Sequence, residues 1–209
     1  RKLLIENENK LKELFETKIN NSDEIYSGEK ILELSKDCDG ILCAVTDQFN
    51  KELIDKLSPS IKIIANYAVG YGNIDVNAAK EKNIVVTNTP EVLDDSTADV
   101  SILLLLGASR KVLEARRAAE LQNWKWSADF MLGKQMSNKR LGILGMGRIG
   151  RAVAKRARGF NMEIHYHNRN QLTKDLEEGA IYHKTIKDLF SCSDFLSINC
   201  PATKETNKI

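Results

Sequence analysis

The sequence is poor in the residues and patterns that mark several classes of protein. It contains only three prolines, and aromatic residues make up 6% of it. Its four cysteines form no CxxC pair, no histidine partners them at zinc-ligand spacing, and three of them lie in or beside apolar runs. This usage argues against a disulfide framework and against a zinc finger. We therefore predict reduced, buried thiols at Cys38, Cys43, Cys192 and Cys200.

The sequence also lacks an excess of one charge and a long apolar run. Lys and Arg number 31 against 29 Asp and Glu, a net charge of +2, which argues against nucleic acid and anionic membranes as partners. The longest apolar run, Ile102–Ala108, is far shorter than the roughly 20 residues that cross a bilayer. No signal peptide pattern opens the chain. We expect a cytoplasmic protein, and a chain truncated at both ends because it lacks an initiating Met and a natural tail.

What the sequence does have is a regular alternation of short β-rich runs and helix-length amphipathic segments. This alternation is typical of α/β folds with parallel sheets and crossover helices. Apolar spacing predicts helices with one buried face at Leu11–Phe15 and Leu53–Leu57, and Asp75 and Asn83 can begin and end a further helix. The predicted strands are residues 40–45, 61–65, 83–87, 141–145, 163–167, 180–183 and 195–199.

The segment from Asp95 to Leu121 departs from this alternation. It is longer than a crossover helix and apolar nearly all round in its first half. Such a helix must be buried against more than one neighbour. We expect it to end one domain and begin a second, with packing against another subunit left open.

A glycine pattern marks a candidate phosphate site. Gly145, Gly147 and Gly150 form G-x-G-x-x-G directly after a predicted strand and at the start of a predicted helix. In that context the first glycine permits the tight turn, the second lets the backbone approach a pyrophosphate, and the third lets helix and strand pack closely. The helix N-terminus then attracts the anion. The pattern predicts a dinucleotide site; a glycine-rich turn without a ligand is the alternative.

The residues after the next strand bear on the choice of cofactor. Asn168 lies 18 residues after Gly150, near the position where a carboxylate commonly binds an adenosine ribose. Here a neutral amide and the cation Arg169 replace that acid, and a guanidinium suits phosphate oxygens. We predict a preference for NADP(H), with NAD(H) as the alternative cofactor. Arg169 as a plain solvated cation is the competing interpretation.

Two histidines raise the question of a metal. His165 and His167 share one face of a predicted strand, but no third ligand is evident near them in the sequence. We therefore predict no metal site and place both histidines beside the adenosine half of the dinucleotide.

Three motifs in order resemble a known family. They are "NYAVGYGNIDVNAAKEKNIVVTNTPEVLDDSTADVSILLLL", "LGILGMGRIGRAVAKRARGFNMEIHYHNRN" and "INCPATKET". Together they resemble the D-isomer-specific 2-hydroxyacid dehydrogenases, and within them the glyoxylate/hydroxypyruvate reductase branch. The resemblance implies a flavodoxin-like substrate domain, residues 1–97, and a Rossmann-type NAD(P)-binding domain, residues 98–209, both incomplete.

The resemblance also implies roles for particular residues. Val69 and Gly70 match a backbone turn that meets the substrate carboxylate, and Thr97 matches a position near the nicotinamide. The cofactor-binding residues predicted from the motifs and the resemblance together are Thr97, Gly145, Gly147, Arg148, Ile149, Gly150, His167, Asn168, Arg169, Cys200 and Pro201.

A homodimer is implied as well. Trp124 and Trp126 resemble a tryptophan pair that reaches the partner subunit in this branch, although their spacing is one residue shorter than expected. Plain packing roles for both are equally compatible with the sequence. The apolar helix around Leu103–Leu106 is a second reason to expect a dimer.

The catalytic Arg, Glu and His of the family have no counterpart in the sequence, and we expect them beyond Ile209. The predicted activity is NADPH-dependent reduction of glyoxylate or hydroxypyruvate, with these 209 residues inactive alone. Two alternatives stay open: a phosphoglycerate-dehydrogenase-like enzyme of the same family, and a non-enzymatic dinucleotide-sensing module.

Overall fold

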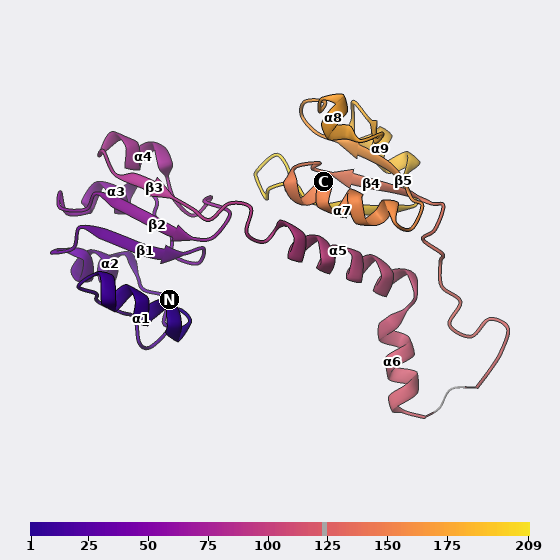
Figure 1. Ribbon diagram of the computed structural model, residues 1–209, viewed down its shortest axis with the longest axis horizontal. Coiled ribbons are helices and arrows are strands. Elements are labelled where there is room, and N and C mark those ends of the chain that lie inside the picture. The colour runs from indigo at the N-terminus through magenta and orange to yellow at the C-terminus, as the bar shows by residue number, and fades with distance from the viewer. Residues whose placement is uncertain (123–124) are drawn as a thin grey trace. The chain divides into compact units, whose positions relative to one another are not determined.

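The computed structural model describes residues 1–122 and 125–209, in two compact units, Arg1–Val92 and Leu93–Ile209 (Figure 1). Each unit has its own parallel sheet and its own hydrophobic core. The boundary after Val92 precedes the one expected after residue 97, because the helix that begins at Asp94 packs against the second unit. Thr97 therefore belongs to the second unit.

The first unit contains a three-stranded parallel sheet in the order β1-β2-β3. Asp75 caps its fourth helix by accepting a hydrogen bond from the Ala78 N–H at 3.0 Å, and Asn83 follows that helix with φ of 58°. Both end signals read from the sequence are confirmed. The elements are α1 (Ile5–Leu14), α2 (Gly28–Ser35), β1 (Gly40–Ala44), α3 (Lys51–Lys56), β2 (Ile63–Tyr67), α4 (Val76–Glu81) and β3 (Val85–Thr87).

Helices cover one face of this sheet. Leu53, Ile54 and Leu57 are buried there, as predicted. The predicted first helix is formed, but the buried face predicted for it is wrong, because Leu14 and Phe15 are both exposed. On the opposite face of the sheet lie four exposed apolar side chains, those of Leu42, Ile63, Tyr67 and Val85.

The second unit contains a four-stranded parallel sheet in the order β6-β5-β4-β7. Numbered within the unit, this is 3-2-1-4, the order found at the start of a Rossmann-type sheet. The predicted fold class is thus confirmed for this unit. Its elements are α5 (Asp94–Ser109), α6 (Val112–Glu120), β4 (Arg140–Leu144), α7 (Arg148–Arg158), β5 (Glu163–His167), α8 (Lys174–Glu177), β6 (Ile181–Tyr182), α9 (Ile186–Cys192) and β7 (Phe195–Ile198).

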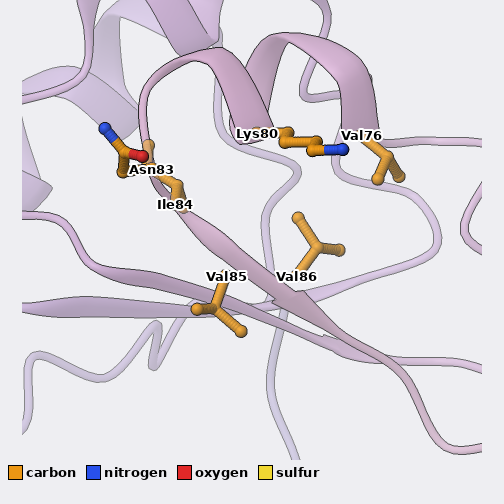
Figure 2. Close-up of a pocket in the computed structure, with 6 residues that line it drawn as sticks. All are labelled: Val76, Lys80, Asn83, Ile84, Val85 and Val86. Carbon is orange, nitrogen blue, oxygen red and sulfur yellow. The ribbon is translucent and has the colours of Figure 1, made fainter.

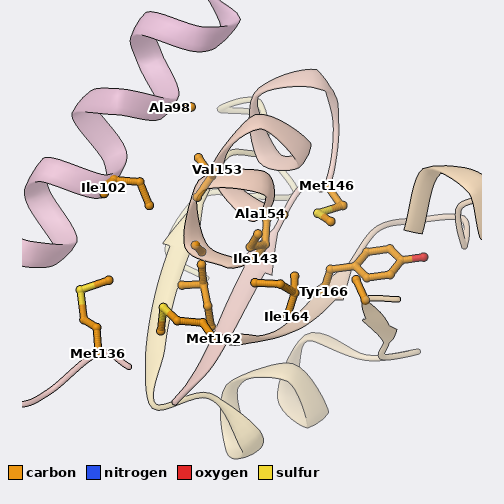
Figure 3. Close-up of a cluster of buried hydrophobic side chains, with 13 residues drawn as sticks. Ala98, Ile102, Met136, Ile143, Met146, Val153, Ala154, Met162, Ile164 and Tyr166 are labelled. Carbon is orange, nitrogen blue, oxygen red and sulfur yellow. The ribbon is translucent and has the colours of Figure 1, made fainter. Parts of the chain in front are cut away.

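The core of the second unit lies between the sheet, α7 and α5. Figure 3 shows Ala98 and Ile102 of α5 on the side of α7 that carries Val153. Arg156 of α7 forms ion pairs with Asp95 and Asp99 of α5, which fix the two helices against each other. The other face of the sheet is covered by α9, which contacts β4 and β5.

The long apolar segment is two helices, contrary to the expectation of one. The chain turns at Lys111, whose φ of 52° is incompatible with a continuous α-helix, and α6 begins at Val112. The burial on several sides is not found within the described part of the chain, since Val100, Leu103 and Leu104 are each more than half exposed. Packing of these residues against another subunit stays a prediction. No helix in the described part of the chain is long and apolar enough to cross a membrane.

All four cysteines are free thiols, as predicted, but only one is fully buried. Burial raises the pKa of the Cys43 thiol to about 12, so this side chain behaves as a small apolar residue. Cys38, Cys192 and Cys200 are half-buried.

Candidate functional site

The glycine loop lies between the end of β4 and the start of α7. Gly145 has φ of 94°, and a Cβ there would lie 2.6 Å from the backbone nitrogen of Cys200. A Cβ at Gly150 would lie 2.4 Å from the carbonyl oxygen of Gly145. A Cβ at Gly147 would meet no atom within 4 Å. Two of the glycines are thus required by close packing, whereas the space beside the third is open to a ligand.

The start of α7 lies beside that space and is not capped by a side chain. Gly147 is the N-cap residue and has no side chain to accept hydrogen bonds from the first turn. Arg148 is exposed, with its Nε 3.4 Å from an oxygen of Asp94 in the first turn of α5. Ile149 is half-buried and packs against the core. The helix end therefore presents amides and positive dipole, the elements of an anion site.

Asn168 holds the glycine loop from the neighbouring strand. Its Oδ1 accepts a hydrogen bond from the Met146 N–H at 2.7 Å, and Met146 itself is buried in the core. The Gly145 N–H donates to the carbonyl of His167 at 3.0 Å. The end of β5 and the glycine loop are therefore joined by two hydrogen bonds. Sequence reasoning assigned Asn168 to the cofactor alone and missed this contact, which no local pattern encodes.

The other residues at the end of β5 differ in their environment. Arg169 is exposed and makes no hydrogen bond or ion pair within the described part of the chain. His167 is half-buried, its Nδ1 bonds the carbonyl oxygen of His183 at 2.8 Å, and its ring stacks on Tyr182. His167 is thus held in place by contacts to its ring, whereas Arg169 is exposed to solvent.

A buried tyrosine supports the loop that follows β5. The Tyr166 hydroxyl donates to Glu177 Oε1 at 2.7 Å and accepts from the Leu172 N–H at 3.0 Å. Burial, followed by the bond to Glu177, raises the pKa of Tyr166 to about 12. Tyr166 therefore stays protonated and anchors the loop beside Asn168. No pattern in the sequence distinguishes Tyr166 from other strand residues.

The backbone of Cys200 lies directly against the glycine loop, because its nitrogen would be only 2.6 Å from a Cβ placed on Gly145. The crevice between β4 and β7, where the strand order reverses, is the usual ligand site of such sheets. Pro201 follows as an exposed residue. Thr97 is half-buried on α5 in the same unit, and no hydrogen bond among the described residues joins it to the glycine loop.

Val69 and Gly70 belong to the first unit, in the turn after β2. Their carbonyl oxygens accept hydrogen bonds from the side-chain amides of Asn88 and Asn66, each at 2.8 Å. Within the described residues, the N–H groups of Val69 and Gly70 have no partner. A turn with its carbonyls engaged and its amides free is suited to a small anion.

The asparagines that hold this turn were not selected from the sequence. Asn66 is buried at the end of β2 and bonds Asn73, which in turn bonds the carbonyls of Ala44 and Asp47. The pattern that could have indicated them is a buried strand that ends in a polar amide.

The predicted tryptophan pair is only partly described. Trp124 lies outside the described residues. Trp126 is 83% exposed, so it packs against little of its own chain. Its expected contact with a second subunit stays a prediction.

The histidines do not stand alone, contrary to the expectation that no third ligand lies near them. His165 is buried, its Nδ1 is 2.8 Å from His183 Nε2, and the Cys192 sulfur is 3.5 Å from each of these two nitrogens. Burial, and next His165, lower the pKa of His183. The cluster could not be predicted from the sequence, because its members come from three separate segments.

A hollow of about 420 Å³ lies elsewhere, beside α4 and β3 of the first unit. Figure 2 shows its lining, which comes from the two ends of α4 and from the strand that follows it. Lys80 is the one charged residue among its lining, and none of the predicted site residues takes part. The hollow therefore has no group for acid–base chemistry beyond a single ammonium.

Comparison with known proteins points to one family. Residues 102–209 match the model described as "D-isomer specific 2-hydroxyacid dehydrogenase, NAD binding domain". A glyoxylate reductase from Thermococcus litoralis is 43% identical over 181 residues, covering 84% of this chain and 54% of the relative. A glyoxylate reductase from Korarchaeum cryptofilum is 41% identical over 199 residues, covering 94% and 60%.

The solved structures agree in fold. The crystal structure of a glyoxylate reductase from Paecilomyes thermophila superimposes with a TM-score of 0.79 at 39% identity, covering 88% of this chain and 58% of that one. The chain thus spans a little over half of the length of the relatives that it resembles.

Proposed function

Because the chain belongs to the D-isomer specific 2-hydroxyacid dehydrogenase family, we propose that it serves the NADPH-dependent reduction of a small 2-oxo acid, glyoxylate or hydroxypyruvate. The observation that carries the proposal is the open space at Gly147, in front of an uncapped helix N-terminus. The identity to glyoxylate reductases supports the substrate class.

The glycine loop and its neighbours would hold the cofactor. The backbone amides at the start of α7, with Arg148 and Ile149, would bind the pyrophosphate, and Cys200 and Pro201 would flank it across the crevice. Asn168 keeps the loop in place through Met146. Bound there, the dinucleotide supplies a hydride to the substrate.

The preference for NADP(H) depends on the end of β5. Residues 167–170 include no carboxylate that would repel a 2′-phosphate. Among the described residues Arg169 makes no hydrogen bond or ion pair, and its acidic neighbour is Glu205, whose pKa is lowered mainly by a hydrogen bond from Thr203 and to a smaller extent by the charge of Arg169. The Asn168 Oδ1 is occupied by Met146, which leaves its amide N–H₂ as a donor. A charge-assisted bond of about 1.5–3 kcal/mol corresponds to roughly ten- to hundredfold in affinity, enough to choose between the cofactors.

Substrate binding would fall to the turn at Val69 and Gly70, whose free N–H groups suit the carboxylate of a 2-oxo acid. Reduction also needs a cation at the carbonyl and a proton donor. His165 and His183 contact each other and Cys192, and His167 bonds a backbone carbonyl, so we assign none of them this role. We expect these 209 residues to bind the dinucleotide without turnover.

A titration of the tag-free chain with NADPH and with NADH, followed by nicotinamide fluorescence, tests the cofactor assignment. Arg169→Ala should weaken NADPH about ten- to hundredfold and leave NADH nearly unchanged. Asn168→Asp keeps an acceptor for the Met146 N–H while adding a negative charge, so it should shift the preference toward NADH. The matched control is Arg117→Ala, an exposed cation on α6.

Two results would count against the proposal. Equal affinity for both cofactors in the parent chain and in Arg169→Ala would remove the NADP(H) preference but keep the dinucleotide site. Binding of neither cofactor by a folded chain would remove the site itself.

We also propose a second copy of this chain as a partner, placed on the exposed apolar residues of α5, Val100, Leu103 and Leu104. Replacing both leucines, Leu103→Glu with Leu104→Glu, should convert a dimer into a monomer by light scattering. The matched control is Leu14→Glu with Phe15→Glu, equally exposed apolar residues at the end of α1 and just after it. A monomeric parent chain would contradict the assignment.

A further inference from the structure

The cluster of His165, His183 and Cys192 has no part in the function proposed above. His165 comes from β5, His183 follows β6, and Cys192 is the last residue of α9. Their nearest ligand atoms, one per residue, all lie within 4.8 Å of one another. Two imidazoles and a thiol at this separation match the donor types that zinc prefers.

The distances agree with a tetrahedral site. Zinc bonds of about 2.0–2.1 Å to nitrogen and about 2.3 Å to sulfur place ligand atoms about 3.3–3.4 Å (N···N) and about 3.6 Å (N···S) apart. The Cys192 sulfur is 3.5 Å from each nitrogen. The two nitrogens, 2.8 Å apart, share a hydrogen bond that an ion would replace by moving them apart by about half an ångström.

A carboxylate orients the first ligand. Glu163 Oε1 lies 2.6 Å from His165 Nε2, so the ring donates its proton there and turns the Nδ1 lone pair toward His183 and Cys192. Metal-binding histidines commonly have such a partner on the nitrogen that faces away from the ion. The hydrogen bond that would orient His165 toward an ion is therefore already formed.

The packing around the cluster lets the three segments approach. Gly142 of β4 pairs with His165 and has no side chain between the sheet and α9. A Cβ at Gly142 would lie 2.0 Å from the hydroxyl oxygen of Ser193, the residue after Cys192. The end of α9 thus sits closer to the sheet than a larger residue in β4 would permit. His183 and Cys192 are half-buried, so water can reach an ion held between the three ligand atoms.

We propose that His165, His183 and Cys192 bind one divalent ion of the zinc class, with water as the fourth ligand. Binding releases the thiol proton of Cys192, which becomes a thiolate, while His183 coordinates through Nε2 and carries its proton on Nδ1. The ion links β5, the segment after β6 and α9. Oxygen-preferring ions such as Mg²⁺ do not suit this donor set.

Cobalt is the probe of choice, because Co²⁺ substitutes for zinc and reports its ligands by its spectrum. The tag-free, chelator-treated and reduced chain is titrated with Co²⁺ under argon. We expect one equivalent to produce the visible bands of tetrahedral cobalt together with a thiolate-to-cobalt charge-transfer band. Added Zn²⁺ should abolish both, and a large excess of Mg²⁺ should leave them unchanged.

Variants assign the ligands. Cys192→Ser should remove the charge-transfer band, whereas Cys38→Ser, which changes another half-buried thiol, should keep it. Glu163→Gln retains all three ligands and should weaken zinc binding by about ten- to hundredfold. Circular dichroism of each metal-free variant confirms that it is folded. If Cys192→Ser does not fold, loss of the tetrahedral bands in a folded His183→Gln variant carries the same test.

The proposal is overturned if the parent chain gives no charge-transfer band, or if that band survives in Cys192→Ser. Unchanged zinc affinity in Glu163→Gln would overturn the part assigned to the carboxylate. Zinc should also raise the melting temperature of the parent chain and not that of Cys192→Ser. These readouts do not depend on cofactor binding, so failure here and failure of the proposed function are distinguishable.

Discussion

The two parallel sheets of the molecule differ in how their faces are covered. In β2 of the first unit, buried and accessible residues alternate, because helices pack on one face only. In β4 of the second unit every residue after Arg140 is buried, because α7 covers one face and α9 the other. A strand buried on both faces is apolar throughout, whereas a strand covered on one side need be apolar only at alternate positions.

The difference also applies to the loops that form the two candidate sites. The glycine loop extends from a strand that is fixed on both faces, so its amides have defined positions. The turn at Gly70 extends from a strand fixed on one face, and side-chain amides supply the remaining support, chiefly Asn66 and Asn88. The candidate site of the second unit is thus supported by packing on both faces of its strand together with the hydrogen bonds of Met146 and Gly145, and that of the first unit chiefly by polar bonds.

The largest expected effect comes from adjacent residues in the two central strands. Ile143→Ala and Leu144→Ala should each cost about 2–5 kcal/mol, because both side chains are buried. Ile64→Ala should cost a similar amount, but Ile63→Ala, at 38% exposure, about 1 kcal/mol or less. Hydrogen exchange resolved by segment measures each unit separately. Equal costs for the two β2 variants would show that both faces of the first sheet are covered in solution.

A smaller effect separates the glycines of the loop. Gly145→Ala combines positive φ with contacts too short for a Cβ, so we expect a loss of about 1–3 kcal/mol of unfolding free energy in the second unit. Gly147→Ala should change stability by about 0.5 kcal/mol or less while weakening dinucleotide binding, since a methyl group there occupies open space. Chemical denaturation and cofactor titration check the pair. Equal destabilisation by both variants would contradict the assigned roles.

The smallest expected effect is a pH dependence in the second unit. Hydrogen bonds from the Arg140 guanidinium and N–H hold the pKa of Asp194 at about 2, below its ordinary value of 3.8. A lowered pKa stabilises the folded state above pH 3.8 and loses that contribution as the pH falls through 2. In Asp194→Asn, the free energy of unfolding of the second unit should fall less steeply between pH 4 and 2 than it does in the parent chain. Asp37→Asn, an exposed acid of the first unit, is the control, and an identical response of both variants would contradict the prediction.

Much of the fold followed from local patterns. Each strand in the described part of the chain was predicted to within a few residues, because alternating and continuous apolar runs report burial directly. The break at Lys111 was missed, since a lysine gives no warning of a left-handed backbone conformation. The exposure of Leu14 and Phe15 was missed because periodicity predicts a face but not what covers it.

The site was predictable where its parts are adjacent in sequence. The glycine loop could be identified because strand, loop and helix follow one another. The bond from Met146 to Asn168 and the approach of Cys192 to His165 could not, because each joins segments whose distance depends on the whole sheet. Long-range contacts of this kind leave no periodic pattern in a single sequence.

The two edge strands of the second sheet differ in length and exposure. β6 ends it with only two residues, one of which, Tyr182, stacks against His167, whereas β7 ends it with four residues that include the exposed Ile198. Exposed edge strands are where separate chains add to a sheet and aggregate. Among these 209 residues, self-association through backbone pairing should therefore start at β7, and a charged residue in place of Ile198 is the change best placed to prevent it.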